Sequence, residues 1–163
     1  ARACGAGNLV FGSPKNRVKP PDVSEDIAVA FFKELGDFAA ANQTVLALEA
    51  NPPVYGTNFM NTTAQALEMA RRVDSPGCKV NLDFGAILTN GEDVGALAGQ
   101  VDMFNHVHIS EPELAMVQQR PQHRTLAALL RAEGYNGYVS IEMKQQTLEN
   151  LKRAAAWVAE VFG

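Results

Sequence analysis

The sequence has few cysteines, no long apolar run and no excess of positive charge, and each absence disfavours a class of protein. Cys4 and Cys78 are the only cysteines in 163 residues, too few and too far apart for a disulfide framework or a CxxC metal site. They are expected to be buried thiols in a reducing cytoplasm, which is the compartment we predict. The net charge of −4 disfavours nucleic acid and anionic membranes as partners, and no apolar run approaches the roughly 20 residues of a membrane span.

A dinucleotide-binding fingerprint is also missing. In the segment GAGNLVFG the glycines precede a strand-like run, whereas a phosphate-binding loop places them between a strand and a helix. The remaining composition, 47% hydrophobic and 20% charged, is that of an ordinary globular protein with a substantial core. We therefore expect residues 1–163 to form a single domain.

Short apolar segments that are typical of buried strands alternate with segments of helical periodicity. The expected strands are 9–11, 44–49, 78–87, 105–112 and 138–144, and the expected helices are 23–42, 62–73, 91–100, 122–133 and 147–162. Ser24 is a candidate N-cap of the first helix, and Thr62 and Gln65 have the spacing of a capping box. The apolar stripe of the first helix consists of Ile27, Phe31, Leu35 and Phe38.

Alternation at the spacing of one βα unit predicts an α/β fold with a parallel sheet and right-handed crossovers. Two architectures fit this pattern. One is an open doubly wound sheet, and the other is part of an eight-stranded βα barrel, which usually needs about 250 residues. The length alone favours the open sheet.

Four consecutive expected strands carry a side chain of a metal-binding type where their apolar character stops. These side chains are Glu49, Asp83, His108 and Glu142, in the segments VLALE, VNLD, NHVHI and VSIE. Because the carboxyl ends of parallel strands lie at the same edge of a sheet, we expect the four groups to lie together. Three carboxylates and one imidazole would repel and lose hydration there without a cation, so a divalent metal is predicted. The oxygen-rich set favours Mn, Mg or Co, with Zn as the alternative.

The segment NHVHISEP adds two polar groups near His108. His106 lies two residues earlier and therefore shares one face of the strand with His108, one pleat deeper. We expect His106 to form a hydrogen bond behind the site rather than to bind the metal. For Glu111 two alternatives stay open: it orients His108 or the following loop, or it faces solvent.

These strand ends, with the segments ALEAN, NTTAQALEMARRVDSPGCKVNLDFGAI, HVHISE and GYNGYVSIE, resemble the xylose-isomerase-like TIM-barrel superfamily of sugar isomerases and epimerases. The resemblance covers nearly the whole chain. It implies that the chain consists of parallel (β/α) units of a TIM barrel, strands four to eight, and is therefore an incomplete barrel. The segment LVFGSP corresponds to strand four.

The resemblance also implies a function. The chain resembles divalent-metal-dependent isomerases or epimerases of a sugar, a sugar phosphate or a related hydroxy-carbonyl compound, which work by proton transfer through an enediolate. By this resemblance Glu49, Asp83, His108 and Glu142 are the metal ligands. Glu49 and Glu142 are in addition the catalytic acid/base pair, while Asp83 and His108 only hold the metal.

Two positions depart from the family pattern, so the resemblance does not fix the sugar. Ala86 stands where many epimerases carry a histidine, and Leu114 stands where they carry an arginine; both of those side chains usually help to hold substrate hydroxyls. Arg17 and His123 are expected in loops at the same edge, and Tyr55 in the loop after the second strand. These three are the candidate substrate-binding residues.

A barrel with five strands exposes two unpaired edges and an apolar interior, which invites aggregation unless something covers it. We therefore expect either a homo-oligomer that pairs the open faces or a longer protein whose N-terminal half is missing here. The aromatic residues at helical spacing, Phe31, Phe32, Trp157 and Phe162, are expected to pack against the outside of the barrel.

Two rival functions stay open beside the isomerase. The first is an apurinic-endonuclease-like metal phosphodiesterase, which would need more histidines than the three present and a basic groove. The second is a truncated barrel that folds but has no activity of its own. The only small-molecule partner that we predict is a sugar-like substrate.

Overall fold

The computed structural model describes residues 1–15 and 17–163, and these residues form two compact units that meet between Leu82 and Asp83. The first unit contains β1 (Asn8–Phe11), α1 (Glu25–Ala41), β2 (Val45–Glu49), α2 (Thr63–Val73) and most of β3 (Cys78–Asp83). The second begins with the last residue of β3 and contains α3 (Phe84–Asn90), β4 (Phe104–Ile109), α4 (Pro121–Ala132), β5 (Tyr138–Ile141) and α5 (Leu148–Phe162). Strands therefore alternate with helices along the chain, as the sequence predicted.

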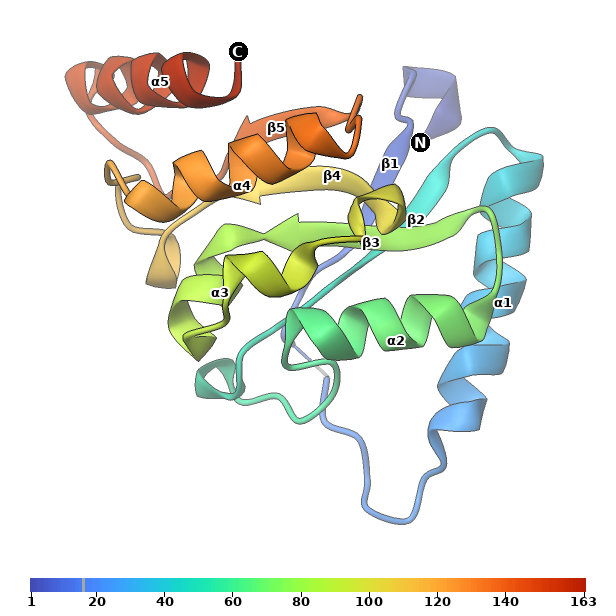
Figure 1. Cartoon of the computed structure of the whole chain (residues 1–163). Helices are drawn as coiled ribbons and strands as arrows, with labels where there is room; N and C mark the ends of the chain where they lie inside the picture. Colours follow the sequence, from blue (N-terminus) through green and yellow to red (C-terminus); the bar gives the residue numbers. More distant parts are fainter. Residues whose placement is uncertain (16) are drawn as a thin grey trace. The chain divides into compact units, whose positions relative to one another are not determined.

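The first unit is built on parallel strands that follow the chain order β1-β2-β3. The register places Phe11 beside Leu48 and Glu49 beside Asn81. Helices α1 and α2 contact each other and β2, as Figure 1 shows. The α2 N-terminus forms the expected capping box, in which the Thr62 hydroxyl accepts from the Gln65 N–H and the Gln65 side-chain oxygen accepts from the Thr62 N–H.

The buried face of α1 differs from the expected one. Its apolar stripe is exposed by more than a third at every position, with Ile27 at 65%, Phe31 at 53%, Leu35 at 37% and Phe38 at 69%. The buried residues of the helix are Phe32, Gly36 and Ala39. Glycine lies at position 36 of this face because the backbone of Gly36 closely approaches Gly77, and a Cβ at either position would collide with its neighbours. Phe31 and Phe32 were expected to pack against the outside of the barrel; this was wrong for Phe31, which is exposed, and is confirmed for Phe32, which is buried.

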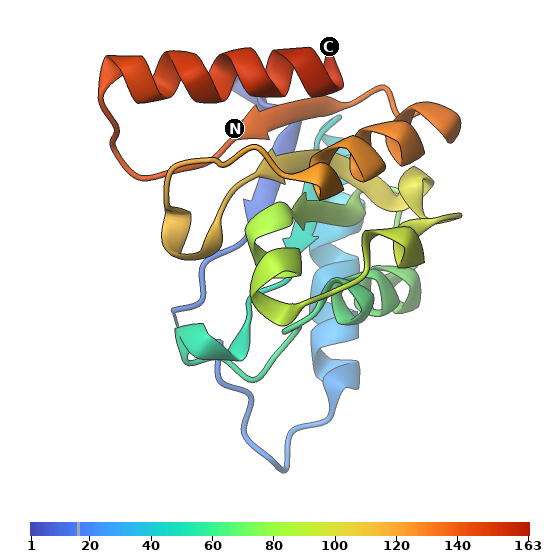
Figure 2. The same cartoon turned by 60° about the vertical axis from the view of Figure 1, so that its left-hand side comes forward.

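The second unit pairs β4 with β5 in parallel, and His108 lies beside Ser140 in the register. Helices α4 and α5 contact each other and α5 also contacts β5 (Figure 2). The side chains of Phe84, Val107, Ile109 and Leu126 are fully buried. Trp157 is also buried, as predicted.

Two expected boundaries around Asp83 were wrong. The strand expected over 78–87 ends at Asp83, and α3 follows without a loop because the Asp83 carboxylate caps the helix. The helix expected over 91–100 is reduced to a 3-10 turn, Val94–Leu97, because Gly91 ends α3 in the left-handed region at φ 65°.

The two cysteines have different surroundings. Cys78 is buried in β3, and burial raises the pKa of its thiol to about 11, as expected for an unreactive core thiol. Cys4 is exposed, which corrects the expectation of a buried thiol. Across residues 1–15 and 17–163, no helix has both the length and the apolar character to cross a membrane.

Candidate active site

Glu49 is the last residue of β2, and its side chain is half-buried. Its Oε2 atom accepts a hydrogen bond from the side-chain amide of Asn81, the neighbouring residue on β3. Its backbone carbonyl accepts from the Arg17 guanidinium at 2.8 Å. Both the main chain and the carboxylate of Glu49 are therefore held by groups of the first unit.

Arg17 connects the ends of two strands. Besides the bond to Glu49, its second terminal nitrogen donates to the Phe11 carbonyl at 2.5 Å, and its guanidinium lies over the Phe11 ring. Burial lowers the pKa of Arg17 to about 10, although the charge of Glu49 acts in the opposite direction. Arg17 was expected to contact substrate from a loop. In this structure its donors bind β1 and β2, and a substrate contact stays a prediction.

In the second unit, the Asp83 carboxylate has a different support on each oxygen. Oδ1 accepts from the Ala86 N–H in the first turn of α3, and Oδ2 accepts from the Ser110 hydroxyl, both at 2.6 Å. The Ser110 oxygen in turn accepts from the Gly85 N–H at 2.8 Å. Because Ser110 is fully buried, the carboxylate is oriented by a rigid set of donors.

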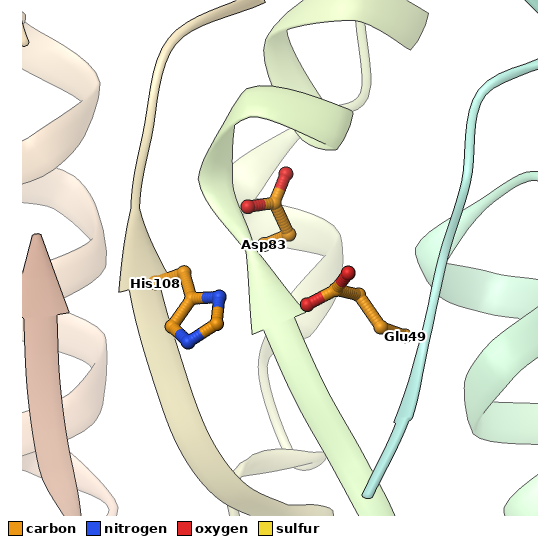
Figure 3. Close-up of side chains that lie close together, drawn as sticks. All are labelled: Glu49, Asp83 and His108. Carbon is orange, nitrogen blue, oxygen red and sulfur yellow. The ribbon is translucent and has the colours of Figure 1, made fainter. Parts of the chain in front are cut away.

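His108 lies near Asp83 and contacts Glu142. Figure 3 shows Asp83 where β3 ends and His108 on β4, and each offers a ligand atom within 4.8 Å of the other. Nδ1 of His108 lies 3.1 Å from Oε2 of Glu142, which directly follows β5. This hydrogen bond lowers the pKa of Glu142, against the effect of its burial. The second unit therefore brings Asp83 close to His108, and His108 into contact with Glu142, whereas Glu49, also drawn in Figure 3, belongs to the first unit.

The donor types in this group fit a divalent cation. Glu49, Asp83 and His108 each offer one candidate ligand atom, a carboxylate oxygen or an imidazole nitrogen. Carboxylate oxygens suit Mg and Mn, and imidazole nitrogen suits Zn and other transition metals. The side chains present are thus chemically suited to hold the metal that the sequence predicted.

His106 and Glu111 lie behind the site. Nε2 of His106 lies 2.8 Å from the Ser140 hydroxyl, and burial, with a smaller effect of His108, lowers the pKa of His106. This is the hydrogen-bonding role that the sequence predicted for His106. Glu111 is buried, and its carboxylate accepts from the Arg120 guanidinium and from the Gln118 N–H. Of the alternatives for Glu111, the structure supports orientation of the following loop.

The remaining candidates, Tyr55 and His123, have different surroundings. Tyr55 ends a short 3-10 helix, Pro53–Tyr55, and is partly exposed, so contact with a ligand stays a prediction. His123 lies inside α4 and not in a loop, which corrects the expectation from the sequence. Its side chain is fully buried, its Nδ1 accepts from the Trp157 indole N–H at 2.9 Å, and its ring packs on Phe84 at 4.4 Å. The packing of His123 is therefore that of a core residue.

The buried His123 predicts that stability falls in mild acid. Burial lowers its pKa from 6.5 to about 4. The charge of Glu111 raises the pKa by a smaller amount, and the charge of Arg120 lowers it further. Between these values the unfolded chain binds a proton that the folded chain does not bind. Stability is therefore complete above pH 6.5 and is lost as the pH falls toward 4, by up to about 3 kcal/mol. Urea unfolding at pH 7 and pH 5 should show most of this loss.

The matched variant is His123→Gln, which keeps an acceptor for Trp157 but does not titrate. We expect its stability to change less between pH 7 and pH 5 than that of the wild type. An equal pH dependence in both proteins would mean that other groups cause the loss.

Several supporting residues were missed from the sequence. Asn81 interrupts an apolar strand two residues before Asp83, and Ser110 follows His108 by two, so both spacings were visible. The polar interruption of a buried strand was the signal for Asn81, and the two-residue spacing from His108 was the signal for Ser110, which directly follows β4. Gly12 gave no such signal, because nothing in the sequence shows which carboxylate lies above it.

Comparison with known proteins identifies the family. Residues 1–161 match the family model of the xylose isomerase-like TIM barrel. The chain belongs to this family. The predicted resemblance is thereby confirmed, as is the α/β fold class of an incomplete TIM barrel, because residues 1–15 and 17–163 contain five strands of the eight that a complete barrel has. The open doubly wound sheet, favoured by length alone, was wrong.

Solved structures with a similar fold are longer than the chain. D-psicose 3-epimerase from Clostridium cellulolyticum H10, solved with D-tagatose, matches with a TM-score of 0.75 at 18% identity, over 91% of this chain and 61% of that chain. AP endonuclease, family 2, from Brucella melitensis matches with a TM-score of 0.75 at 19% identity, over 98% of this chain and 62% of that chain. The IolI protein with a bound zinc atom matches with a TM-score of 0.75 at 20% identity, over 97% of this chain and 63% of that chain. The chain spans about three fifths of each, and no curated protein matches its sequence.

Proposed function

We propose that the chain carries the metal ligands and the acid/base residues of a divalent-metal-dependent sugar isomerase or epimerase. The observation that carries this proposal is the arrangement of donors in the second unit. Asp83 and His108 offer ligand atoms within 4.8 Å of each other, and His108 contacts Glu142 at 3.1 Å. All three residues lie at or next to the carboxyl ends of parallel strands, where barrel enzymes place their catalytic groups.

We propose Glu49 as the fourth ligand. It ends β2 as Asp83 ends β3, and parallel strands direct such residues to the same edge. Three carboxylates and one imidazole favour Mn, Mg or Co, and the zinc atom of the IolI structure makes Zn the next candidate. A divalent ion held by these side chains would polarise a substrate carbonyl and acidify the adjacent C–H.

Glu49 and Glu142 are the proposed proton carriers. The hydrogen bond from His108 keeps Glu142 ionised, and its side chain is 43% exposed, so it is able to accept a proton from a bound molecule. Glu49 would exchange the second proton, on the opposite face of the substrate or at the neighbouring carbon. The proposed substrate is a ketose or a related hydroxy-carbonyl compound, with Arg17 and Tyr55 as proposed contacts.

Metal titration tests this proposal. Calorimetric titration with Mn²⁺ should give a measurable affinity for the wild type and an affinity at least ~10-fold lower for Glu142→Gln, which keeps the size of the side chain but not its charge. Glu149→Gln, an exposed glutamate of α5, is the matched control and should bind like the wild type. Equal and negligible affinity in all three proteins would favour the inactive barrel.

The phosphodiesterase alternative has less support. It needs additional histidine ligands, yet His123 is enclosed in the core and His106 contacts Ser140. Nicking of abasic plasmid DNA by the protein would revive it. The homo-oligomer also stays a prediction, and the exposed stripe of α1 supports a covering partner, either a second copy or further polypeptide. Light scattering of the protein in solution gives the molar mass that tests it.

A further inference from the structure

The carboxylate of Glu49 lies next to Gly12 and Asn81. Gly12, directly after β1, lies below one carboxylate oxygen, and Asn81 on β3 donates to the other. All three residues belong to the first unit. One oxygen of Glu49 thus occupies the space that the missing side chain of Gly12 leaves, and the other accepts a hydrogen bond.

Gly12 provides space that any other residue would fill. A Cβ at this position would lie 2.5 Å from Oε1 and 3.1 Å from Cδ of Glu49, whereas real Cβ contacts essentially never fall below 3.0 Å. The φ of Gly12 is not positive, so its backbone conformation does not itself require glycine. The closest obstacle to a side chain is the Glu49 carboxylate, and Cγ1 of Val10, 3.1 Å from the same Cβ position, is a weaker second one.

The main chain around Gly12 is fixed. Its carbonyl accepts from the buried side-chain amide of Asn51 at 2.7 Å, and the preceding carbonyl, of Phe11, accepts from Arg17. Because these contacts hold the strand end in place, the main chain at residue 12 cannot easily shift to carry an added methyl group away from Glu49. Glu49 would have to move instead.

Asn81 provides a neutral donor beside the Glu49 carboxylate, where a second negative charge would be repelled. It is 1% exposed, and it is the register neighbour of Glu49. A carboxylate accepts hydrogen bonds only, and a donor that does not titrate satisfies one oxygen without neutralising the group. An aliphatic residue of the same volume would fill the space but supply no donor.

We infer that Gly12 and Asn81 are positioning residues, which hold the Glu49 carboxylate in one orientation and thereby raise the affinity of the site for a divalent ion. This inference rests on the proposed function, in which Glu49 is a ligand. Groups behind a ligand commonly raise metal affinity 10- to 100-fold by fixing its orientation. Neither residue would touch the ion.

The test is calorimetric titration of the full chain with MnCl₂. Gly12→Ala and Asn81→Ala should each weaken binding by about 10- to 100-fold. Gly7→Ala is the matched control, because a Cβ at Gly7 meets no atom within 4 Å and its φ is not positive. Asn58→Ala removes a surface amide that binds only the backbone of Lys19 among the bonds described, and it controls for loss of an asparagine. Both controls should bind like the wild type.

Asn81→Leu, which keeps the buried volume, replaces Asn81→Ala if that variant does not fold. Thermal unfolding without metal gives an independent readout. Gly12→Ala should lower the unfolding midpoint clearly more in the wild type than in a Glu49→Ala background, where the colliding carboxylate is absent and only the looser contact with Val10 remains. A structural role of Gly12 alone would lower both midpoints equally.

The outcomes separate the two proposals. If the wild type binds Mn²⁺ and the Gly12 and Asn81 variants bind it equally well, the inference is overturned while the proposed function stands. If the wild type binds no Mn²⁺, the proposed function fails, and the two midpoints still decide whether Gly12 confines Glu49. Equal shifts in both backgrounds then overturn the inference as well.

Discussion

Glu49→Gln is expected to slow proton exchange between a ketose and solvent by about 1,000-fold, or about 4 kcal/mol in the barrier. Glutamine keeps the length of the side chain and fits the space between Gly12 and Asn81, but it accepts no proton. Incorporation of deuterium from D₂O into D-tagatose, followed by NMR with saturating MnCl₂, measures the rate directly. Saturating metal separates the loss of the proton carrier from a loss of ligand affinity.

The matched control for this experiment is Glu68→Gln on α2, an exposed glutamate in the same unit. Its exchange rate should equal that of the wild type. A Glu49→Gln protein that keeps more than about a tenth of the rate would remove Glu49 from proton transfer. Its proposed role would then be limited to binding the metal.

Asp83→Asn is expected to lower the affinity for a divalent ion by on the order of 1,000-fold, about 4 kcal/mol. Asparagine is as good an N-cap as aspartate, so α3 keeps the hydrogen bond to the Ala86 N–H while the ligand loses its charge. The change therefore separates the charge of Asp83 from its structural role. Calorimetry with MnCl₂ measures the affinity, and circular dichroism checks that the helices are retained.

Asp93→Asn provides the matched control, because Asp93 also caps a short helix, through the Gly95 N–H, in the same unit. It should leave Mn²⁺ affinity unchanged. Comparable affinities for the Asp83 and Asp93 variants would show that Asp83 is a cap and not a ligand.

The strand ends could be predicted because they follow from local rules. An apolar run that stops at an ionisable residue ends a buried strand, and Glu49 and Asp83 are indeed the last residues of β2 and β3. His108 lies one residue before the end of β4 and Glu142 one residue after β5. Boundaries were less certain where a residue has two roles. Asp83 ends a strand and caps a helix at once, and the sequence pattern favoured a longer strand.

The support around these residues could not be predicted because it depends on register and close packing. That Asn81 lies beside Glu49 follows from how β2 and β3 align, which no local pattern specifies. The prediction of the buried face of α1 was wrong for a similar reason. Hydrophobicity favoured the stripe that contains Phe31, but the close approach of Gly36 to Gly77 selects the face that contains Gly36. His123 was assigned to a loop although the helix expected over 122–133 already includes it, and in the structure it is the third residue of α4, which begins at Pro121.

Trp157, whose indole N–H donates to His123, is an intrinsic fluorescent probe of its surroundings. Trp157 is the only tryptophan of the chain, and it lies in the unit formed by residues 83–163. Its emission therefore follows the melting of that half alone, while far-ultraviolet ellipticity follows the helices of both halves. Any divergence between the two signals in one denaturation curve would reveal halves that melt independently, without a label or an added chromophore.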